Sequence, residues 1–198
     1  MVEELKKLEQ YALDNNIPII QKDGLKFIIS YINNNNVKKV LEIGSAIGYS
    51  SIAFALSNNN INITTIERDK ERFHEAVQNI NKFNLNNQIK IYNVDAFDYA
   101  DDNKYDLIFI DAAKAQSIKF FEKFKNNLNK NGVIITDNLS FHGLVEHPEN
   151  THNRNTKQLV RKIQKYIDFL KENRDFNTEF YDVGDGISVS KNIHQNNY

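Results

Sequence analysis

The 198-residue chain has no cysteine, and it has no stretch rich in proline, glycine and serine. The lack of cysteine excludes disulfides, zinc–thiolate sites and thiol catalysis, so any metal must be held by oxygen or imidazole ligands. The lack of a linker-like stretch favours a single domain over residues 1–198. No apolar run reaches the roughly 18 to 20 residues that span a membrane, and the amino terminus is charged rather than signal-like. We therefore expect a cytoplasmic protein without a membrane partner.

A large excess of charge of one sign is also missing. The formal net charge is −1. A chain so balanced has no overall attraction for nucleic acid, so a polyanionic partner would have to be held by a local basic patch.

The pattern of the chain predicts an α/β protein. Short β-rich runs alternate with helical patterns, which is typical of a parallel sheet. The expected strands are residues 37–43, 61–67, 88–94, 105–111, 132–138, 177–183 and 186–192. The expected helices include 2–15, 22–33, 69–83 and 155–172. The last two strands flank a Gly-Asp-Gly turn and predict an antiparallel hairpin.

Five βα units followed by a hairpin is the element order of the Rossmann-like class I methyltransferases. A dinucleotide dehydrogenase would instead continue with a second parallel half. We expect a seven-stranded, mostly parallel sheet with an antiparallel terminal hairpin and helices on both faces. The helices within residues 1–33 are expected to cover an edge of the site or a subunit interface.

The first expected strand leads into a glycine turn, LEIGSAIGYSS. Gly44, Ser45 and Gly48 form this turn, in which the backbone can approach a ligand closely. The spacing G-x-x-x-G differs from the dinucleotide fingerprint G-x-G-x-x-G, so a pyrophosphate is disfavoured. Glu42, just before the turn, suits a ligand that carries an ammonium group, as methionine does.

Acidic residues follow the next two expected strands. Glu67 lies about twenty residues beyond the turn, where a carboxylate can accept hydrogen bonds from both hydroxyls of a ribose. Asp95, followed by Ala96, could receive the exocyclic amine of an adenine. Each feature alone is common in turns and strand ends; their order along successive strands predicts S-adenosylmethionine as the cofactor.

Polar residues also follow the fourth and fifth expected strands. Asp111, Asp137 and Asn138 would meet at the carboxyl edge of the sheet, where open α/β sheets bind ligands. Two carboxylates and an amide oxygen suit Mg2+ better than zinc. Asp137 and Asn138 could also be only a turn-forming pair.

Four segments, EIGSAIGYS, IERD, FIDAAK and ITDNLSFHG, resemble the cation-dependent O-methyltransferases typified by catechol and caffeoyl-CoA O-methyltransferases. The resemblance extends over about residues 17 to 191. It implies a divalent metal on Asp111, Asp137 and Asn138, and Lys114 beside the reacting hydroxyl. The cofactor pocket that it implies is lined by Glu42, Gly44, Tyr49, Ser50, Glu67, Ala96 and Asp111.

The chemistry of such a site is simple. A cation stabilises the oxyanion of the acceptor, and Lys114, if neutral, could take the proton as general base. The sulfonium needs little activation, so the enzyme mainly aligns oxygen, methyl carbon and sulfur. Lys114 could alternatively be an ion-pairing surface residue.

The expected helix 155–172 carries a basic face. Five basic residues and no acidic one occur between Thr151 and Tyr166: Arg154, Lys157, Arg161, Lys162 and Lys165. Such a run is often only a solvated face, but a phosphate backbone is one natural counterpart. DNLSFHGLV, this helix and VGDGISVSKN resemble the bacterial tRNA 5-hydroxyuridine methyltransferases. That subgroup implies a tRNA acceptor, modified at the wobble position to 5-methoxyuridine, and a homodimer.

Two alternatives stay open at this point. A small-molecule enzyme acting on catechols or hydroxycinnamoyl-CoA esters would share every catalytic residue. A non-catalytic cofactor-binding or RNA-binding factor would not need Asp111, Lys114, Asp137 and Asn138 together. The surface histidines of the loop after the fifth strand, His142, His147 and His152, have no role that the sequence assigns.

Overall fold

The structure, a computed structural model, describes residues 2–193, so the ends of the expected domain, residues 1 and 194–198, lie outside it. A seven-stranded sheet forms the centre. Its strands are β1 (Lys39–Ile43), β2 (Asn62–Glu67), β3 (Ile89–Asn93), β4 (Tyr105–Ile110), β5 (Leu128–Thr136), β6 (Phe176–Tyr181) and β7 (Ile187–Asn192).

The strand order is β3-β2-β1-β4-β5-β7-β6. Strands β1 to β5 pair in parallel, whereas β7 runs antiparallel to both β5 and β6. This arrangement confirms the predicted Rossmann-like methyltransferase fold and its antiparallel terminal hairpin. The order reverses between β1 and β4, so the loops that follow these two strands lie side by side at the carboxyl edge.

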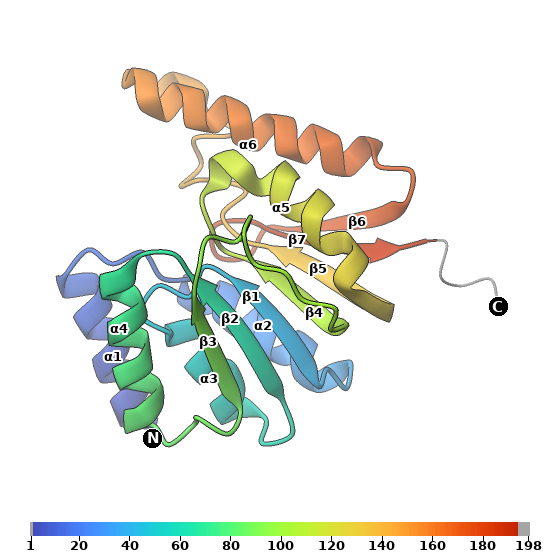
Figure 1. Cartoon of the computed structure of the whole chain (residues 1–198). Coiled ribbons are helices and arrows are strands. Elements are labelled where there is room, and N and C mark those ends of the chain that lie inside the picture. Colours follow the sequence, from blue (N-terminus) through green and yellow to red (C-terminus); the bar gives the residue numbers. More distant parts are fainter. Residues whose placement is uncertain (1, 194–198) are drawn as a thin grey trace.

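Helices cover both faces of the sheet (Figure 1). They are α1 (Val2–Asp14), α2 (Lys22–Asn34), α3 (Tyr49–Ser57), α4 (Lys70–Lys82), α5 (Ser117–Phe124) and α6 (Arg154–Glu172). In one hydrophobic core, helices α1, α2, α3 and α4 pack together with the strand side chains of one face of the sheet, such as Val40 and Leu107. The other joins α5 and α6 to the alternate side chains, such as Leu41 and Ile108. Because successive side chains of a strand point to opposite faces, both faces of the sheet are apolar and each is covered by helices, which gives three layers.

The amino-terminal helices pack on α3, and α2 also contacts the terminal hairpin, where the rings of Phe27 and Tyr181 lie 4.7 Å apart. Leu8 and Ala12 are the buried residues of α1, whereas Tyr11 and Leu13 are 45% and 59% exposed. A role for this region at a subunit interface remains a prediction.

Two expectations about the strands and their connections were wrong. β5 begins at Leu128, four residues before the expected start, and its pairing with β4 shifts register between Tyr105 and Leu107. The extra residues are accommodated because Asn131 adopts a φ of 70° and residue 132 is a glycine. A Cβ at Gly132 would lie only 2.8 Å from the carbonyl oxygen of Tyr105. No helix links β3 to β4, since the connecting residues 94–104 are rich in aspartate and form turns.

Within residues 2–193, no helix is both long and apolar enough to cross a bilayer.

Candidate active site

The residues after β4 and β5 meet at the carboxyl edge of the sheet. Asp111 donates its backbone N–H to the carbonyl of Ile43 at 3.0 Å, which fixes it beside the end of β1. The side-chain amide nitrogen of Asn138 lies 2.9 Å from Asp137 Oδ2 and 3.4 Å from Asp111 Oδ1. The structure therefore brings together the three side chains that the sequence predicted as metal ligands.

Asp137 is the most deeply buried member of this cluster, at 1% exposure. Burial, and then the negative charge of Asp111, raises the pKa of Asp137 to about 7. Its Oδ1 atom is buried and has no hydrogen-bond partner among the residues that the structure describes. A buried carboxylate oxygen without a partner is unfavourable unless a ligand or water satisfies it.

Lys114 belongs to the same cluster. Its Nζ atom lies 2.8 Å from Asp111 Oδ1, and the two side chains are 18% and 15% exposed. The short 3-10 helix η1 (Lys114–Gln116) begins at this lysine, so its backbone is fixed close to the sheet edge. Lys114 is thus no freely solvated surface residue, but a half-buried cation at the mouth of the site.

The glycine turn between β1 and α3 lies next to Asp111. Gly44 has a φ of +95°, and a Cβ there would lie 2.6 Å from the Asp111 carbonyl oxygen. Gly48, with a φ of +82°, precedes the first residue of α3. The Ser45 hydroxyl is buried without a hydrogen-bond partner in the described part of the chain. The turn thus lies close against Asp111 and has a buried polar atom available to a ligand, while its approach to a cofactor stays a prediction.

Glu42 lies beneath this turn and is fully buried. Its carboxylate accepts hydrogen bonds from the hydroxyls of Ser50, Ser51 and Thr65. Burial raises the pKa of Glu42 to about 7, although the three hydroxyl bonds oppose the shift. Its direct contact with an ammonium group stays a prediction, since the structure shows it holding α3 and β2 together.

Two further predicted cofactor residues begin α3. Ser50 is 5% exposed and is bonded to Glu42, while Tyr49 is 3% exposed. Burial, with the nearby Glu9 carboxylate of α1, raises the pKa of Tyr49 to about 12. The tyrosine hydroxyl is therefore turned toward the amino-terminal helices.

The acids after β2 and β3 also hold backbone in place. Glu67 accepts the N–H groups of Ala46 at 2.9 Å and Asp69 at 2.8 Å, one on each carboxylate oxygen. Each oxygen keeps capacity for a further hydrogen bond, such as one from a ribose hydroxyl. Asp95 accepts the N–H of Phe97 at 2.9 Å, and Ala96 is 7% exposed.

The sequence missed one acidic residue of this region. Asp185, in the turn between β6 and β7, is 3% exposed and accepts the N–H of His142 at 2.5 Å. Its backbone carbonyl accepts the N–H of Ser140 at 2.8 Å. The Gly-Asp-Gly pattern was recognised only as a turn, and no local signal placed it beside the loop after β5.

The basic helix α6 lies next to this edge. It packs against η1, which carries Lys114, and the Tyr166 hydroxyl lies 2.8 Å from Thr136 Oγ1 at the end of β5. Five basic residues of α6 have no ion pair with any acid of residues 2–193: Arg154, Lys157, Arg161, Lys162 and Lys165. Their positive charge is therefore not neutralised by ion pairs within residues 2–193.

The sheet with its glycine turn after β1, acids after β2 and β3, and a polar cluster after β4 and β5 defines a Rossmann-like methyltransferase. The chain belongs to the O-methyltransferase family, whose sequence model matches residues 1–193. The predicted activity, S-adenosylmethionine-dependent O-methyl transfer, is thereby confirmed at the level of the family.

Individual relatives extend this picture. A caffeoyl-CoA O-methyltransferase from Stellaria longipes is 27% identical over 79% of this chain and 69% of its own length. A flavonoid 3',5'-methyltransferase from Vitis vinifera is 24% identical over 97% of this chain and 88% of its own. A crystal structure from Staphylococcus aureus, assigned as a caffeoyl-CoA O-methyltransferase, is 40% identical with a TM-score of 0.91, covering 95% and 91% of the two chains. These names describe those proteins, and the tRNA acceptor of this chain stays a prediction.

Proposed function

We propose that this enzyme methylates the 5-hydroxyl of 5-hydroxyuridine at the tRNA wobble position, using a divalent cation held by Asp111, Asp137 and Asn138. The observation that carries the proposal is the position of α6. Its five basic residues, which have no ion pair in the described part of the chain, lie on the helix that packs against η1, the turn that begins at Lys114. A polyanionic acceptor is the ligand that such a surface favours.

The side-chain oxygen atoms of the cluster favour a divalent cation. Both carboxylates and the amide oxygen are hard ligands of the kind that Mg2+ prefers. Asp137 Oδ1 is buried and lacks a hydrogen-bond partner within residues 2–193, which is expected of an atom that coordinates a ligand. Asn138 would have to turn its amide so that the oxygen, and not the nitrogen, faces the carboxylates. No group of three or more histidine or acidic side chains that could hold a metal occurs in the described residues, so the set needs Asn138.

A cation bound there would supply Lewis acidity that favours the ionised form of the acceptor hydroxyl. The chain's own residues do the remaining work. Asp111 holds Lys114 at 2.8 Å on the acceptor side. In its neutral form, after the ion pair has opened and the ammonium proton has passed to solvent, Lys114 takes the hydroxyl proton as a general base. The half-buried setting of both side chains keeps bulk water from the reacting oxygen.

The cofactor is expected on the glycine turn. In this proposal the Ser45 hydroxyl and the turn backbone meet the amino-acid end of S-adenosylmethionine. Glu67 receives the ribose hydroxyls, and Asp95 beside Ala96 faces the adenine. This order points the methyl group toward Asp111 and Lys114, because the turn touches Asp111 directly.

An unstacked anticodon base suits this site, because it can be presented singly to a pocket. The 5-hydroxyl and the C4 carbonyl of the base form a chelating pair like the two oxygens of a catechol. The same likeness means that a catechol or a hydroxycinnamoyl-CoA ester could use the same cluster. The names of the relatives point to that acceptor class, so it is the outcome against which the proposal is tested.

The test is methyl transfer from labelled S-adenosylmethionine, with Mg2+ or with EDTA, to tRNA containing 5-hydroxyuridine and in parallel to a catechol. We expect metal-dependent labelling of the tRNA at that base, well above catechol turnover. Labelling of the catechol alone would make this a small-molecule enzyme and α6 a solvated face. Binding of cofactor without transfer to either acceptor would favour a non-catalytic factor.

A further inference from the structure

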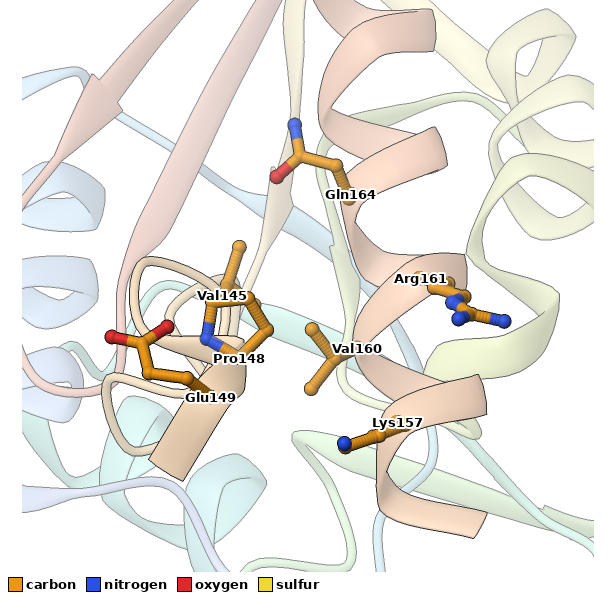
Figure 2. A pocket seen from close by; sticks show the side chains of 7 residues that line it. All are labelled: Val145, Pro148, Glu149, Lys157, Val160, Arg161 and Gln164. Carbon is orange, nitrogen blue, oxygen red and sulfur yellow. The ribbon is translucent and has the colours of Figure 1, made fainter. Parts of the chain in front are cut away.

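A cavity of about 470 Å3 lies between the segment after β5 and the middle of α6 (Figure 2). Val145, Pro148 and Glu149 form one wall. Lys157, Val160, Arg161 and Gln164 of α6 form the other. None of these residues belongs to the catalytic cluster, so the cavity is a separate feature beside it.

The floor of the cavity is apolar. Val160 is 5% exposed, and Figure 2 shows its side chain directed toward Val145 and Pro148. A cavity of this size, mostly apolar with a few polar groups, is typical of a site for a small ligand or for part of a larger one. A flat heterocycle could lie against the proline ring and the valine.

The cavity lining includes two basic side chains, Lys157 and Arg161, and one acidic side chain, Glu149. Figure 2 shows the Lys157 side chain directed toward the segment with Pro148, whereas the Arg161 guanidinium points away from it. The Lys157 ammonium has no ion pair or hydrogen bond within residues 2–193. The Glu149 carboxylate lies 3.2 Å from the His147 Nδ1 atom, and its side chain is 69% exposed, so its charge is largely hydrated. The unneutralised ammonium therefore favours an anionic group such as a phosphate.

The cavity is continuous in the chain with the catalytic edge. The segment that forms its first wall begins at Asn138, and the opposite wall belongs to the helix that packs against η1. A ligand that reaches from Lys114 into the cavity would thus remain on the same two elements.

We propose that this cavity binds a nucleotide adjacent to the methylated base, with its base against Pro148 and Val160 and its phosphate at Lys157. The inference rests on the RNA acceptor proposed above. It adds that the enzyme holds a neighbour of the target as well as the target, which would orient the target hydroxyl toward Lys114.

The phosphate contact is tested by binding of an anticodon stem-loop RNA, followed by fluorescence anisotropy at several salt concentrations. We expect Lys157→Gln to weaken binding and to reduce the slope of log affinity against log salt by about 0.7, as for one phosphate contact to a single strand. Lys171→Gln is the matched control, because it removes the same charge from the last turn of α6, outside the cavity lining and outside the set of five basic residues. Equal effects of the two variants would indicate a general basic face and overturn the proposal.

The base contact is tested with RNAs that carry an abasic site at one or the other neighbour of the target. Wild-type protein should lose roughly five- to tenfold in affinity when the correct neighbour lacks its base, within the range of a single base-stacking contact. In Pro148→Ser, the same abasic site should have little further effect. Independent, multiplicative losses would place the base elsewhere.

The two proposals fail in different ways. Wild-type protein that methylates a catechol, and neither binds nor methylates the RNA, would overturn the RNA acceptor and the cavity site together. Wild-type protein that methylates 5-hydroxyuridine in tRNA, while Lys157→Gln and Pro148→Ser both bind RNA like wild type, would overturn the cavity site alone.

Discussion

The carboxylate of Asp185 accepts the backbone N–H of His142 at 2.5 Å, across 43 residues of sequence. The bond ties the turn between β6 and β7 to the loop that follows the catalytic cluster. That loop needs a tether, because Asn138, Phe141 and His142 all have positive φ values, of 66°, 49° and 58°. Strained backbone of this kind persists only where its surroundings hold it.

Replacing Asp185 should therefore loosen the catalytic edge. We expect Asp185→Ala to lower the free energy of unfolding by about 1 to 3 kcal/mol, since the His142 N–H loses its acceptor in a partly buried place. The KM for the acceptor should rise while the Kd for S-adenosylmethionine changes little. Asp185→Asn keeps an oxygen acceptor and should recover most of the loss. Denaturant titration and steady-state kinetics measure both effects, and an Asp185→Ala enzyme with wild-type kinetics would show that the tether is not needed.

The tether also marks the limit of what the sequence could predict. Parallel strands end at one edge, so the meeting of Asp111, Asp137 and Asn138 followed from the strand pattern alone. Asp185 approaches that edge only because β7 inserts antiparallel beside β5, and a turn motif carries no information about which loop lies opposite. The cavity at Lys157 likewise forms between a loop and a helix, and a linear pattern describes neither the gap nor the side-chain directions.

Burial was the other quantity that the sequence could not supply. Glu42 was expected to face the ammonium group of a ligand, because it directly precedes the glycine turn. The pattern could not reveal that Ser50, Ser51 and Thr65 would surround it. By contrast, Ile163, Tyr166 and Leu170 of α6 are buried and recur every three or four residues, a spacing that can be seen in the sequence because helical periodicity determines which face packs.

The surroundings of Glu42 predict a pH-dependent stability. Burial raises its pKa in the folded protein to about 7 from an ordinary 4.5. An acid with a raised pKa stabilises the fold below its unfolded pKa, and this contribution is lost as pH rises through about 7. Without cofactor, Glu42→Gln should gain stability relative to wild type between pH 5 and pH 8, by on the order of 3 kcal/mol. Thermal unfolding at several pH values checks this; a difference that does not vary with pH would contradict the buried, protonated state.

The glycine turn predicts a clash that differs from simple backbone strain. Gly44→Ala would place a methyl group 2.6 Å from the Asp111 carbonyl oxygen, in addition to forcing alanine to a φ of +95°. Gly143→Ala is the matched control, since Gly143 has a φ of +76° but no atom within 4 Å of the position that a Cβ would take. We expect Gly143→Ala to lose about 1 to 2 kcal/mol of stability from strain alone. Gly44→Ala should lose about 1 to 3 kcal/mol more, as an overpacked site does, and should also lose activity because Asp111 moves. Similar unfolding free energies for the two variants would show that the contact between the turn and Asp111 adds no cost beyond backbone strain.

Replacing Asp137 should reduce methyl transfer without a comparable loss of cofactor affinity or of stability. Asp137→Ala removes one of two carboxylates from the proposed ligand set, so methyl transfer should fall by roughly a hundredfold or more and should not recover with added Mg2+. The Kd for S-adenosylmethionine, measured by calorimetry, should stay within a few-fold of wild type, because the glycine turn and Glu67 are untouched. The fold should survive as well. Burial raises the pKa of Asp137 to about 7, so at pH 8 the variant relieves a buried charge and its unfolding free energy should not drop sharply.

Asp102→Ala, at an exposed aspartate of the loop before β4, is the control and should behave as wild type in all three measurements. Turnover that survives in Asp137→Ala would exclude this carboxylate from the chemistry, whereas parallel loss of transfer, cofactor binding and stability would mean that it acts only through the fold.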